Sequence, residues 1–584
     1  MSTHSDQKNA GYVIEESSDL DRGVFVEKQQ GWFGRALDKV AVEKNNTSSV
    51  KELFLYNYDL KPVETARRKW AWFNFVFFWV ADALNVNSLE IAATGVTQGL
   101  TWWQTWISVW LGYFLASTFV VAMARPGAAY HVSFPVACRA SFGIFGSLWP
   151  VLNRVVMAII WFAVQSWIMG QCVQVMLMAI FGTDLDTRIG TQNLSGTTSF
   201  QFLSFFIAWV IQLPFLWFPP QTIRHLFTVK SVVVPIIGVV YLVWCLKRAD
   251  GLGEMFTAKS SLEGNDLGWA FVRSTMNCVA NFSALIINAP DFSRFSRKKT
   301  DPILSQWLTI PISFSLATLV GILTAAASPT LFPGDPKTPY WSPLQILSGF
   351  LTEGNYTSGD RAGVFFIGAG FSLAQIGTNI AANSISCGTD LTAMLPKYMN
   401  IRRGSYICGI LALCICPWHL FESSNKFTTY LSAYSVFLSS IAGVIACDYY
   451  FIRRGYFKID DLYSGEKTSS YMYNGLGLNW RAYAAYLLGI VPNMTGFVGE
   501  VGGTVPQGAI YVFYLNYFVG FITSFIVYAV FNWISPIDAM PNGRNLFYKG
   551  WKEEEPYVDD FDDKYRGKNL HYHKNNDLVA IASR

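Results

Sequence analysis

Long apolar runs recur along this chain, and they constrain its fold more than any other feature. Each run is about 20 residues long, the length that a helix needs to cross the ~30 Å hydrocarbon core of a bilayer. Only 14% of the 584 residues are charged, whereas roughly a quarter of the residues in a soluble domain are charged. The sequence therefore predicts an all-α, polytopic membrane protein.

Hydropathy along the chain predicts about twelve transmembrane helices. The predicted spans are 74–97, 101–124, 148–181, 200–219, 227–247, 269–289, 303–328, 362–383, 404–420, 427–451, 482–499 and 509–534. Basic residues gather in the short loops after even-numbered spans, as at Arg294, Arg297 and Lys298. Because such loops face the cytoplasm, both termini are expected there.

Four regions follow from these spans. We expect a cytoplasmic N-terminal tail (1–69), a ten-helix transport core (70–451), two additional transmembrane helices (452–535) and a cytoplasmic C-terminal tail (536–584). The N-terminal tail has no signal-peptide core, and its residues 32–41 predict either a short amphipathic helix or part of a loosely tethered tail. A ubiquitin ligase is a candidate partner of this tail, through Lys8, Lys28, Lys39, Lys44 and Lys51.

Two pairs of polar residues with helical spacing stand out within apolar spans. Trp161 and Gln165 are four residues apart, so they share one helix face, as do Asn379 and Asn383. An indole plate with nearby amides suits a small planar ring that carries N–H donors and C=O acceptors. The pattern predicts a membrane transporter for such a ring, against the alternative of a packing tryptophan and interhelical amide contacts.

Spans one and six, which are five spans apart along the chain, contain an unusual number of polar residues. The polar residues are Asp82, Asn85 and Asn87 in span one, with Glu90 beyond them, and Arg273, Asn277, Asn281 and Ser283 in span six. Polar groups inside a membrane need partners or a watery cavity. This arrangement is typical of two five-helix halves of opposite orientation, with interrupted first helices and a binding site near the bilayer midplane. Short asparagine side chains can satisfy the backbone groups freed at an interruption.

Other functional classes are disfavoured by the sequence. The nine cysteines form no CxxC pair, and the six histidines are scattered, so we expect neither a metal site nor a cofactor. No nucleophile–base pattern indicates an enzyme, and the net charge of +4 implies no nucleic-acid surface. A channel or a nutrient sensor would share the architecture, but neither accumulates its ligand uphill.

Several longer motifs occur in order between about residue 50 and residue 535. They include Leu60-Lys61-Pro62-Val63-Glu64, Asn85-Val86-Asn87, Trp102-Trp103-Gln104-Thr105-Trp106, Asn153-Arg154-Val155-Val156, Arg224-His225-Leu226-Phe227-Thr228-Val229-Lys230 and Asn288-Ala289-Pro290-Asp291-Phe292. With these motifs the chain resembles the nucleobase–cation symporter-1 family, in its fungal uracil, allantoin and uridine permease branch. The resemblance implies a 5+5 inverted-repeat (LeuT-like) fold, with spans eleven and twelve as additions.

The resemblance also assigns substrate-binding roles. It implies that Trp161 stacks on the ring, that Gln165 and Asn383 hydrogen-bond to it, that Asn379 lies one turn before Asn383, and that Asn85 faces the ligand from span one. A primary amide offers one acceptor and two donors, so it can pair with the alternating C=O and N–H groups of uracil. Stacking of a base on an aromatic ring contributes about 1–3 kcal/mol.

The same resemblance bears on the driving cation. The sodium site of a bacterial relative uses main-chain oxygens of span one and two hydroxyls of span eight. The matching positions here are Ala81, Leu84, Ala374, Gly377 and Thr378. Gly377 supplies no hydroxyl, and a hard cation needs several oxygen ligands. We therefore expect a vestigial cation site and coupling to protons instead.

Proton symport requires a titratable group in the core. The candidates are Asp82 and Glu90 of span one, with Lys230 at the start of span five as a counter-charge. The alternatives are an Asp82 that serves only as a structural ion-pair partner and a Glu90 that faces an outer vestibule. The resemblance makes span ten an outer gate through Tyr434, Phe437 and Leu438, where the alternative is ordinary packing.

The substrate expected from these features is uracil, with allantoin second and uridine third. Uracil, allantoin and hydantoins share the pattern N–H, C=O, N–H, whereas a nucleoside would need extra room and partners for its ribose. The resemblance implies that Gln165 favours a free base or a ureide, because the uridine-permease relatives lack an amide there. The expected partners are thus uracil or a related ureide, a proton and membrane lipid. We expect the protein at the plasma membrane.

Overall fold

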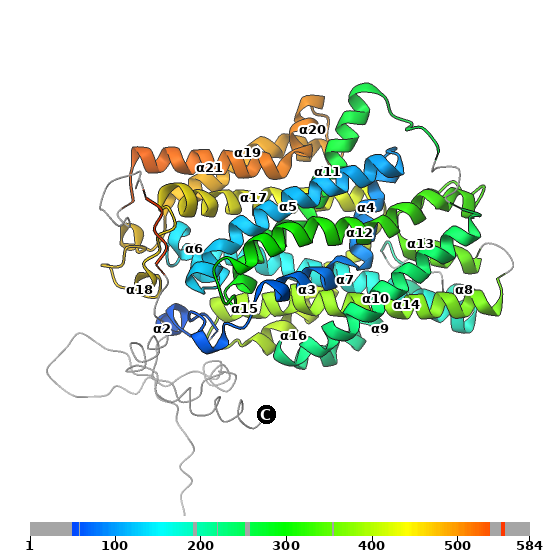
Figure 1. The fold of residues 1–584 in the computed structure, drawn as a ribbon, viewed down its shortest axis with the longest axis horizontal. Helices are drawn as coiled ribbons and strands as arrows, with labels where there is room; N and C mark the ends of the chain where they lie inside the picture. The colour runs from blue at the N-terminus through cyan, green and yellow to red at the C-terminus, as the bar shows by residue number, and fades with distance from the viewer. Residues whose placement is uncertain are drawn as a thin grey trace, which may run out of the picture.

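The computed structural model describes residues 50–57, 59–190, 195–218, 220–251, 257–352, 356–537 and 550–554. In these ranges the chain is helical, with one isolated β-bridge between Trp70 and Ser296. The helix expected over 32–41, the lysines Lys8, Lys28, Lys39 and Lys44, and most of the C-terminal tail lie outside them. Figure 1 shows the long helices running roughly side by side.

The helices differ widely in length. The longer ones are α5 (Trp102–Tyr130), α7 (Leu148–Phe181), α9 (Ser199–Gln212), α10 (Pro220–Arg248), α11 (Gly264–Ser293), α12 (Asp301–Leu331), α14 (Ser358–Thr378), α17 (Ser424–Ala446), α19 (Trp480–Glu500) and α21 (Asn516–Ile534). The shorter ones are α2 (Val50–Leu55), α3 (Trp72–Ala83), α4 (Val86–Thr97), α6 (Phe134–Phe142), α8 (Leu185–Ile189), α13 (Pro343–Thr352), α15 (Ile385–Met394), α16 (Ile401–Ala412), α18 (Ile459–Leu462) and α20 (Gln507–Tyr514).

Nine helical segments in the described part are long and apolar enough to cross a membrane, and the bent pair α3–α4 makes a tenth. The all-α polytopic fold is thereby confirmed. Two of the twelve predicted spans fall on helices that do not meet this test. Span 404–420 falls on α16, which ends at Ala412 and continues only as 3-10 turns, and span 482–499 falls on α19, which contains Pro492.

Span one is interrupted at its middle, as expected. Helices α3 and α4 meet at an angle of 63°, and Asn85 joins the two ends. Its Oδ1 accepts a hydrogen bond from the Ser88 N–H at 2.9 Å, and its Nδ2 donates to the Asp82 carbonyl at 2.8 Å. The asparagine therefore satisfies backbone groups that the break leaves without helical partners.

The matching interruption expected in span six is wrong. Helix α11 runs unbroken from Gly264 to Ser293, so Asn277 and Asn281 project from an intact helix. Irregularity appears instead in span eight, where α14 continues through a π-helical turn at Asn379–Ser384 into α15. Such turns are rare and occur often at functional sites.

Both described ends of the chain lie at the same end of the helix bundle. Helices α2, α6 and α18 gather there, on the left of Figure 1. Arg139 of α6 donates to the carbonyls of Leu55 and Leu462, and Arg125 of α5 pairs with Glu553 near the C-terminus. This end also carries the basic loop residues that led us to expect cytoplasmic termini.

Candidate functional site

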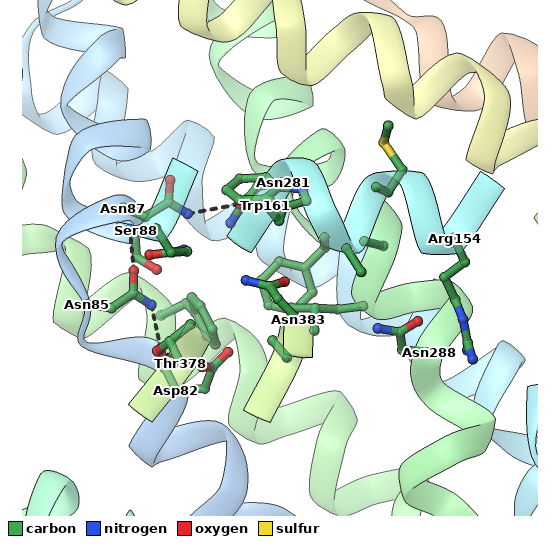
Figure 2. Close-up of a pocket in the computed structure, with 18 residues that line it drawn as sticks. Asp82, Asn85, Asn87, Ser88, Arg154, Trp161, Asn281, Asn288, Thr378 and Asn383 are labelled. Carbon is green, nitrogen blue, oxygen red and sulfur yellow. Dashed lines mark hydrogen bonds between the residues drawn. The ribbon is translucent and has the colours of Figure 1, made fainter. Parts of the chain in front are cut away.

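A small cavity of about 50 Å³ lies in the middle of the bundle. Its walls come from the α3–α4 break, α7, α11, α12 and the π-turn of span eight (Figure 2). The lining residues are Asp82, Asn85, Asn87, Ser88, Arg154, Met157, Ala158, Trp161, Gln165, Asn281, Phe282, Ala284, Leu285, Asn288, Phe314, Thr378, Ala382 and Asn383. The mixed apolar and polar lining and the small volume suit a compact flat ring with polar groups on its edge.

Trp161 and Gln165 both line this cavity from α7, as their spacing predicts. Both side chains are buried. The Gln165 carbonyl oxygen accepts no hydrogen bond from any described residue. An unsatisfied buried acceptor costs about 1–3 kcal/mol, so a ligand N–H that reached this oxygen would remove that penalty.

The two amides of span eight have different surroundings. Asn383 lines the cavity, and its Nδ2 donates to Asn379 Oδ1 at 2.9 Å. Asn379 is not part of the cavity lining that the described residues form. Its Nδ2 points to other helices, where it donates to Gln212 Oε1 at 2.6 Å and to the Phe162 carbonyl at 3.2 Å. Asn379 thus holds Asn383 in place, with the Asn383 carbonyl oxygen left for a ligand.

The span-one break brings further amides to the cavity. Asn85 is part of the lining, although its amide is already bonded within the break. Asn87 donates from Nδ2 to Asn281 Oδ1 of α11 at 3.3 Å (Figure 2). The sequence signal for Asn87 and Asn281 was polarity within an apolar span, but polarity alone did not place them on the cavity wall.

Lys230 lies at the position where the family resemblance implies a vestigial cation site. Lys230 of α10 donates from Nζ to Thr378 Oγ1 at 2.6 Å, and the Thr378 hydroxyl donates to Asp82 Oδ1 at 3.3 Å. The Lys230 Nζ itself is 4.0 Å from Asp82 Oδ1. A Cβ added to Gly377 would lie 2.8 Å from Lys230 Cδ, so the missing side chain leaves room for the lysine.

The remaining positions of the predicted cation site lie on the same two elements. Ala81 and Leu84 are at the end of α3, and Ala374 is buried on α14 with Gly377 and Thr378. The other acidic candidate, Glu90, is separate from this group. Glu90 is completely buried on α4 and accepts a hydrogen bond from Ser342 Oγ at 2.7 Å, so it does not face an open vestibule.

Of the three predicted gate residues of α17, Tyr434 and Leu438 are buried and Phe437 is exposed. Tyr434 packs edge-on against Trp161, with ring centroids 6.1 Å apart at 87°, and its hydroxyl donates to the Ala280 carbonyl at 2.8 Å. Leu438 is buried, whereas Phe437 is 38% exposed on the outside of the helix. Of the three, Tyr434 is the residue in ring contact with Trp161.

A buried ion cluster that the sequence did not predict lies at another side of the cavity, where Arg154 is part of the lining. Arg154 of α7 pairs with Asp390 of α15 and with Asp291 of α11. All three are largely or completely buried, and the guanidinium also lies 4.4 Å from the ring centroid of Phe134. Arg154 appeared only as part of a motif, and Asp390 lies beyond the predicted end of span eight.

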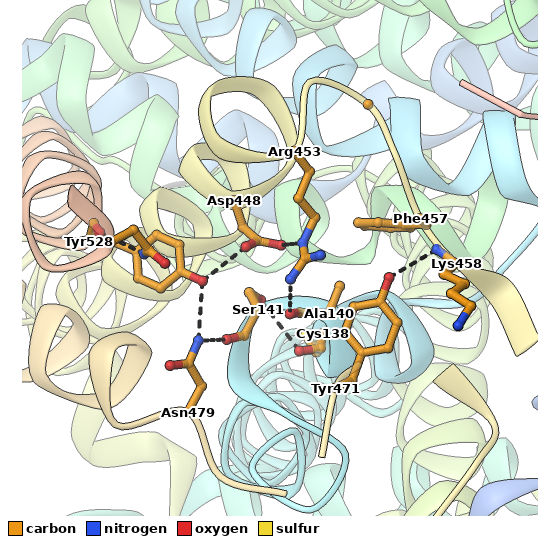
Figure 3. A network of polar contacts seen from close by, with 12 residues as sticks. Cys138, Ala140, Ser141, Asp448, Arg453, Phe457, Lys458, Tyr471, Asn479 and Tyr528 are labelled. Carbon is orange, nitrogen blue, oxygen red and sulfur yellow. Dashed lines mark hydrogen bonds and ion pairs between the residues drawn. The ribbon is translucent and has the colours of Figure 1, made fainter. Parts of the chain in front are cut away.

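Span ten is anchored at the end opposite to Tyr434. Asp448, in the π-turn that follows α17, accepts from Arg453 Nε at 2.8 Å and from the Tyr528 hydroxyl at 2.9 Å. Asn479 donates to the same hydroxyl at 3.2 Å (Figure 3). These bonds tie span ten to the last two spans and fix the C-terminal end of the helix that carries Tyr434.

The family model of permeases for cytosine/purines, uracil, thiamine and allantoin matches residues 62–520. The chain belongs to this family. The protein is therefore a permease, a membrane transporter rather than an enzyme, and the resemblance found in the sequence is confirmed.

Curated relatives cover nearly the whole chain. The allantoin permease of Saccharomyces cerevisiae is 48% identical, over 92% of this chain and 85% of the relative. The uracil permease of the same yeast is 47% identical, over 96% and 90%, and its uridine permease is 46% identical, over 89% and 81%. The three identities are so close that they do not separate the three substrates.

The fold of this permease matches a solved transporter. A structure of Mhp1, a nucleobase–cation-symport-1 family transporter in a closed conformation with bromovinylhydantoin bound, has a TM-score of 0.65 and 21% identity. The match covers 85% of this chain and 98% of the other. An inward-facing structure of Mhp1 matches with the same TM-score and 22% identity. The LeuT-like fold expected for this family is confirmed.

Proposed function

We propose that this permease imports uracil across the plasma membrane by proton symport, with alternating access to the central cavity. The observation that carries the substrate class is the Gln165 carbonyl, buried at the cavity wall without a partner among the described residues. The Asn383 carbonyl and the Trp161 ring lie on the same cavity. Two acceptors and one aromatic plate match a flat ring with N–H groups on its edge.

The aromatic surroundings of Trp161 support stacking. Among the described residues its ring contact is the edge-on one with Tyr434, and no ring lies parallel to it. A base stacked on such an indole gains about 1–3 kcal/mol. Tyr434, held to the Ala280 carbonyl, would then cover the bound ring, and the resulting exclusion of water would strengthen its hydrogen bonds.

Uracil is favoured over uridine by the size and lining of the cavity. The cavity volume is about 50 Å³, so a nucleoside would require a larger expansion of the site than a free base does. A ribose would need additional space and its own polar partners. Allantoin is the second candidate, because it shares the N–H, C=O, N–H pattern and because the allantoin permease is as similar to this chain as the uracil permease is.

The Lys230–Thr378–Asp82 group supports proton coupling. It links three spans that are distant in sequence, because Lys230 lies on α10, Thr378 on α14 and Asp82 on α3. Protonation of Asp82 would remove its attraction to the Lys230 ammonium and loosen α3 from α14. The membrane potential supplies about 2.3 kcal/mol per charge per 100 mV, so each proton can drive the uphill uptake of a neutral ring.

Uptake of labelled uracil into yeast cells that lack their own uracil transport tests this function. We expect saturable accumulation above the outside concentration, and stronger competition by unlabelled uracil than by allantoin or uridine. Gln165→Ala should abolish uptake, while Gln171→Ala, on the same helix but outside the cavity lining, should retain it. Stronger competition by allantoin than by uracil would identify allantoin as the substrate. If none of the three compounds accumulated, the proposed function would be contradicted.

A further inference from the structure

A second, larger cavity lies apart from the central one. It has a volume of about 340 Å³ and sits between α4, α11, α17 and α20, and its lining shares no residue with the central cavity. The lining residues are Thr97, Gln98, Asp266, Trp269, Ala270, Arg273, Asn425, Gln507, Tyr511 and Tyr514. They occur where α4 ends, in the first turns of α11 and α17, and along α20, which is the end of the bundle opposite to the chain termini in Figure 1.

The wall of this outer cavity is aromatic. Trp269 and Tyr511 stack with ring centroids 4.1 Å apart and an interplanar angle of 4°, and Tyr514 lies beside Trp269 at 6.4 Å. A further flat ring can stack readily on planar side chains that are already aligned in this way. The volume lies within the range of cavities that hold small organic ligands.

The arginine beside the outer cavity is engaged by a carboxylate. Arg273 donates to Glu500 at 3.0 Å, and its guanidinium lies 5.1 Å from the centroid of Tyr514. Glu500 also accepts from the Thr429 hydroxyl at 3.1 Å. With the guanidinium engaged in this way, and with the Asp266 carboxylate on the same wall, the outer cavity disfavours an anionic ligand.

Gln98 supplies the polar group that such a ligand would meet. Both its amide nitrogen and its amide oxygen are buried, and neither has a hydrogen-bond partner among the described residues. Each unsatisfied group costs about 1–3 kcal/mol. A ligand edge with one C=O next to one N–H would satisfy the donor and the acceptor together.

We propose that this outer cavity is a second binding site for a neutral planar ring with adjacent N–H and C=O groups. Gln98 pairs with the edge of the ring, and the Trp269–Tyr511 stack supports its face. This is the chemical class of the substrate in the function proposed above, and the choice of uracil as the probe rests on that function. The outer site holds the ring at the mouth of the permease, separately from the central cavity.

Equilibrium binding of labelled uracil to the purified full-length permease tests the proposal. The wild type should bind two uracil molecules per chain, with a tighter and a weaker affinity. Gln165→Ala should remove the tighter one and leave the weaker. Gln98→Leu, which keeps the side-chain size, should weaken the second by about tenfold or more and leave the tighter one unchanged. Gln171→Ala should keep both.

Two results would overturn the outer site. One molecule of uracil per wild-type chain, lost in Gln165→Ala and unaffected by Gln98→Leu, contradicts the outer site while the proposed function stands. No binding of uracil to the wild type contradicts both proposals. Should Gln98→Leu fail to fold, Trp269→Leu replaces it, and a second binding event of unchanged affinity in that variant also refutes the site.

Discussion

The Lys230 ammonium lies 4.0 Å from the Asp82 carboxylate, and both contact the Thr378 hydroxyl. The lysine comes from span five, the aspartate from the broken span one, and the threonine from span eight. A cationic side chain thus occupies the region where the sequence lacks the oxygens for a sodium site. This arrangement places the proposed coupling group directly beside the central cavity, which Asp82 and Thr378 both line.

Removal of the Lys230 charge should uncouple uptake from the proton gradient. Lys230→Met is expected to lower the steady-state accumulation of uracil at least about tenfold, because Asp82 then has no counter-charge and favours its neutral form in the buried site. Accumulation with and without a protonophore is the measurement. Lys247→Met, at an exposed position of the same helix, is the control. Wild-type accumulation in Lys230→Met would contradict the assignment.

Replacement of external sodium by choline should leave wild-type uptake unchanged. The position of one hydroxyl in the expected sodium site is Gly377, and the space beside it is filled by Lys230. A hard cation requires several oxygen ligands. Initial rates of uracil uptake in the two media give the answer, and a loss of uptake in choline would show that sodium is the coupling ion.

Gly377→Ala should impair transport for a steric reason. The new Cβ would lie 2.8 Å from Lys230 Cδ, a distance that forces the lysine away from Thr378. We expect uptake to fall several-fold with the protein still at the cell surface. Gly359→Ala is the matched control on the same helix, since its Cβ would meet its nearest neighbour at an ordinary 3.4 Å. Equal uptake in the two variants would refute the packing argument.

Arg154→Met should destabilise the fold strongly. Loss of the guanidinium leaves Asp390 and Asp291 buried without their cation, and breaking a buried pair in this way costs about 3–5 kcal/mol. Thermal unfolding in detergent should show a clearly lower midpoint. Arg188→Met, which removes an exposed pair with Asp184, should change the midpoint little. Similar midpoints for both variants would contradict the buried cluster.

The C-terminal contact of Glu553 predicts a pH dependence. Burial raises the pKa of this carboxyl, but hydrogen bonds from Arg125 and Tyr449 outweigh it and hold the pKa below its ordinary value. The contact therefore stabilises the fold above the unfolded pKa of about 4.3, and this stabilisation is lost as the pH falls through the folded pKa. Glu553→Gln should lower the unfolding midpoint at pH 7, and its difference from the wild type should shrink in acid. A difference independent of pH would refute this.

The central pair of the site was predictable because its signal is local. Four-residue spacing on one helix is enough to place Trp161 and Gln165 on one face, and the structure brings both to the cavity. The role of Asn379 was not predictable in the same way. Its amide meets Gln212, a partner from a distant span, and spacing within one helix carries no information about such contacts.

The longer-range features depended on the packing of several spans. The fold class followed from the apolar runs, whereas the Arg154–Asp390 pair joins residues far apart in sequence. The π-turn at Asn379–Ser384 extends span eight into α15 and brings Asp390 into the bundle. Hydropathy alone ended that span at residue 383, so the carboxylate partner of Arg154 was placed outside the membrane.

A structure of the permease with uracil bound is the most direct test of the account. We predict ring density stacked on Trp161, with a ring N–H near the Gln165 carbonyl and a second near the Asn383 carbonyl. Uracil density found elsewhere in the bundle, with Trp161, Gln165 and Asn383 all free of contact, would contradict the central claim.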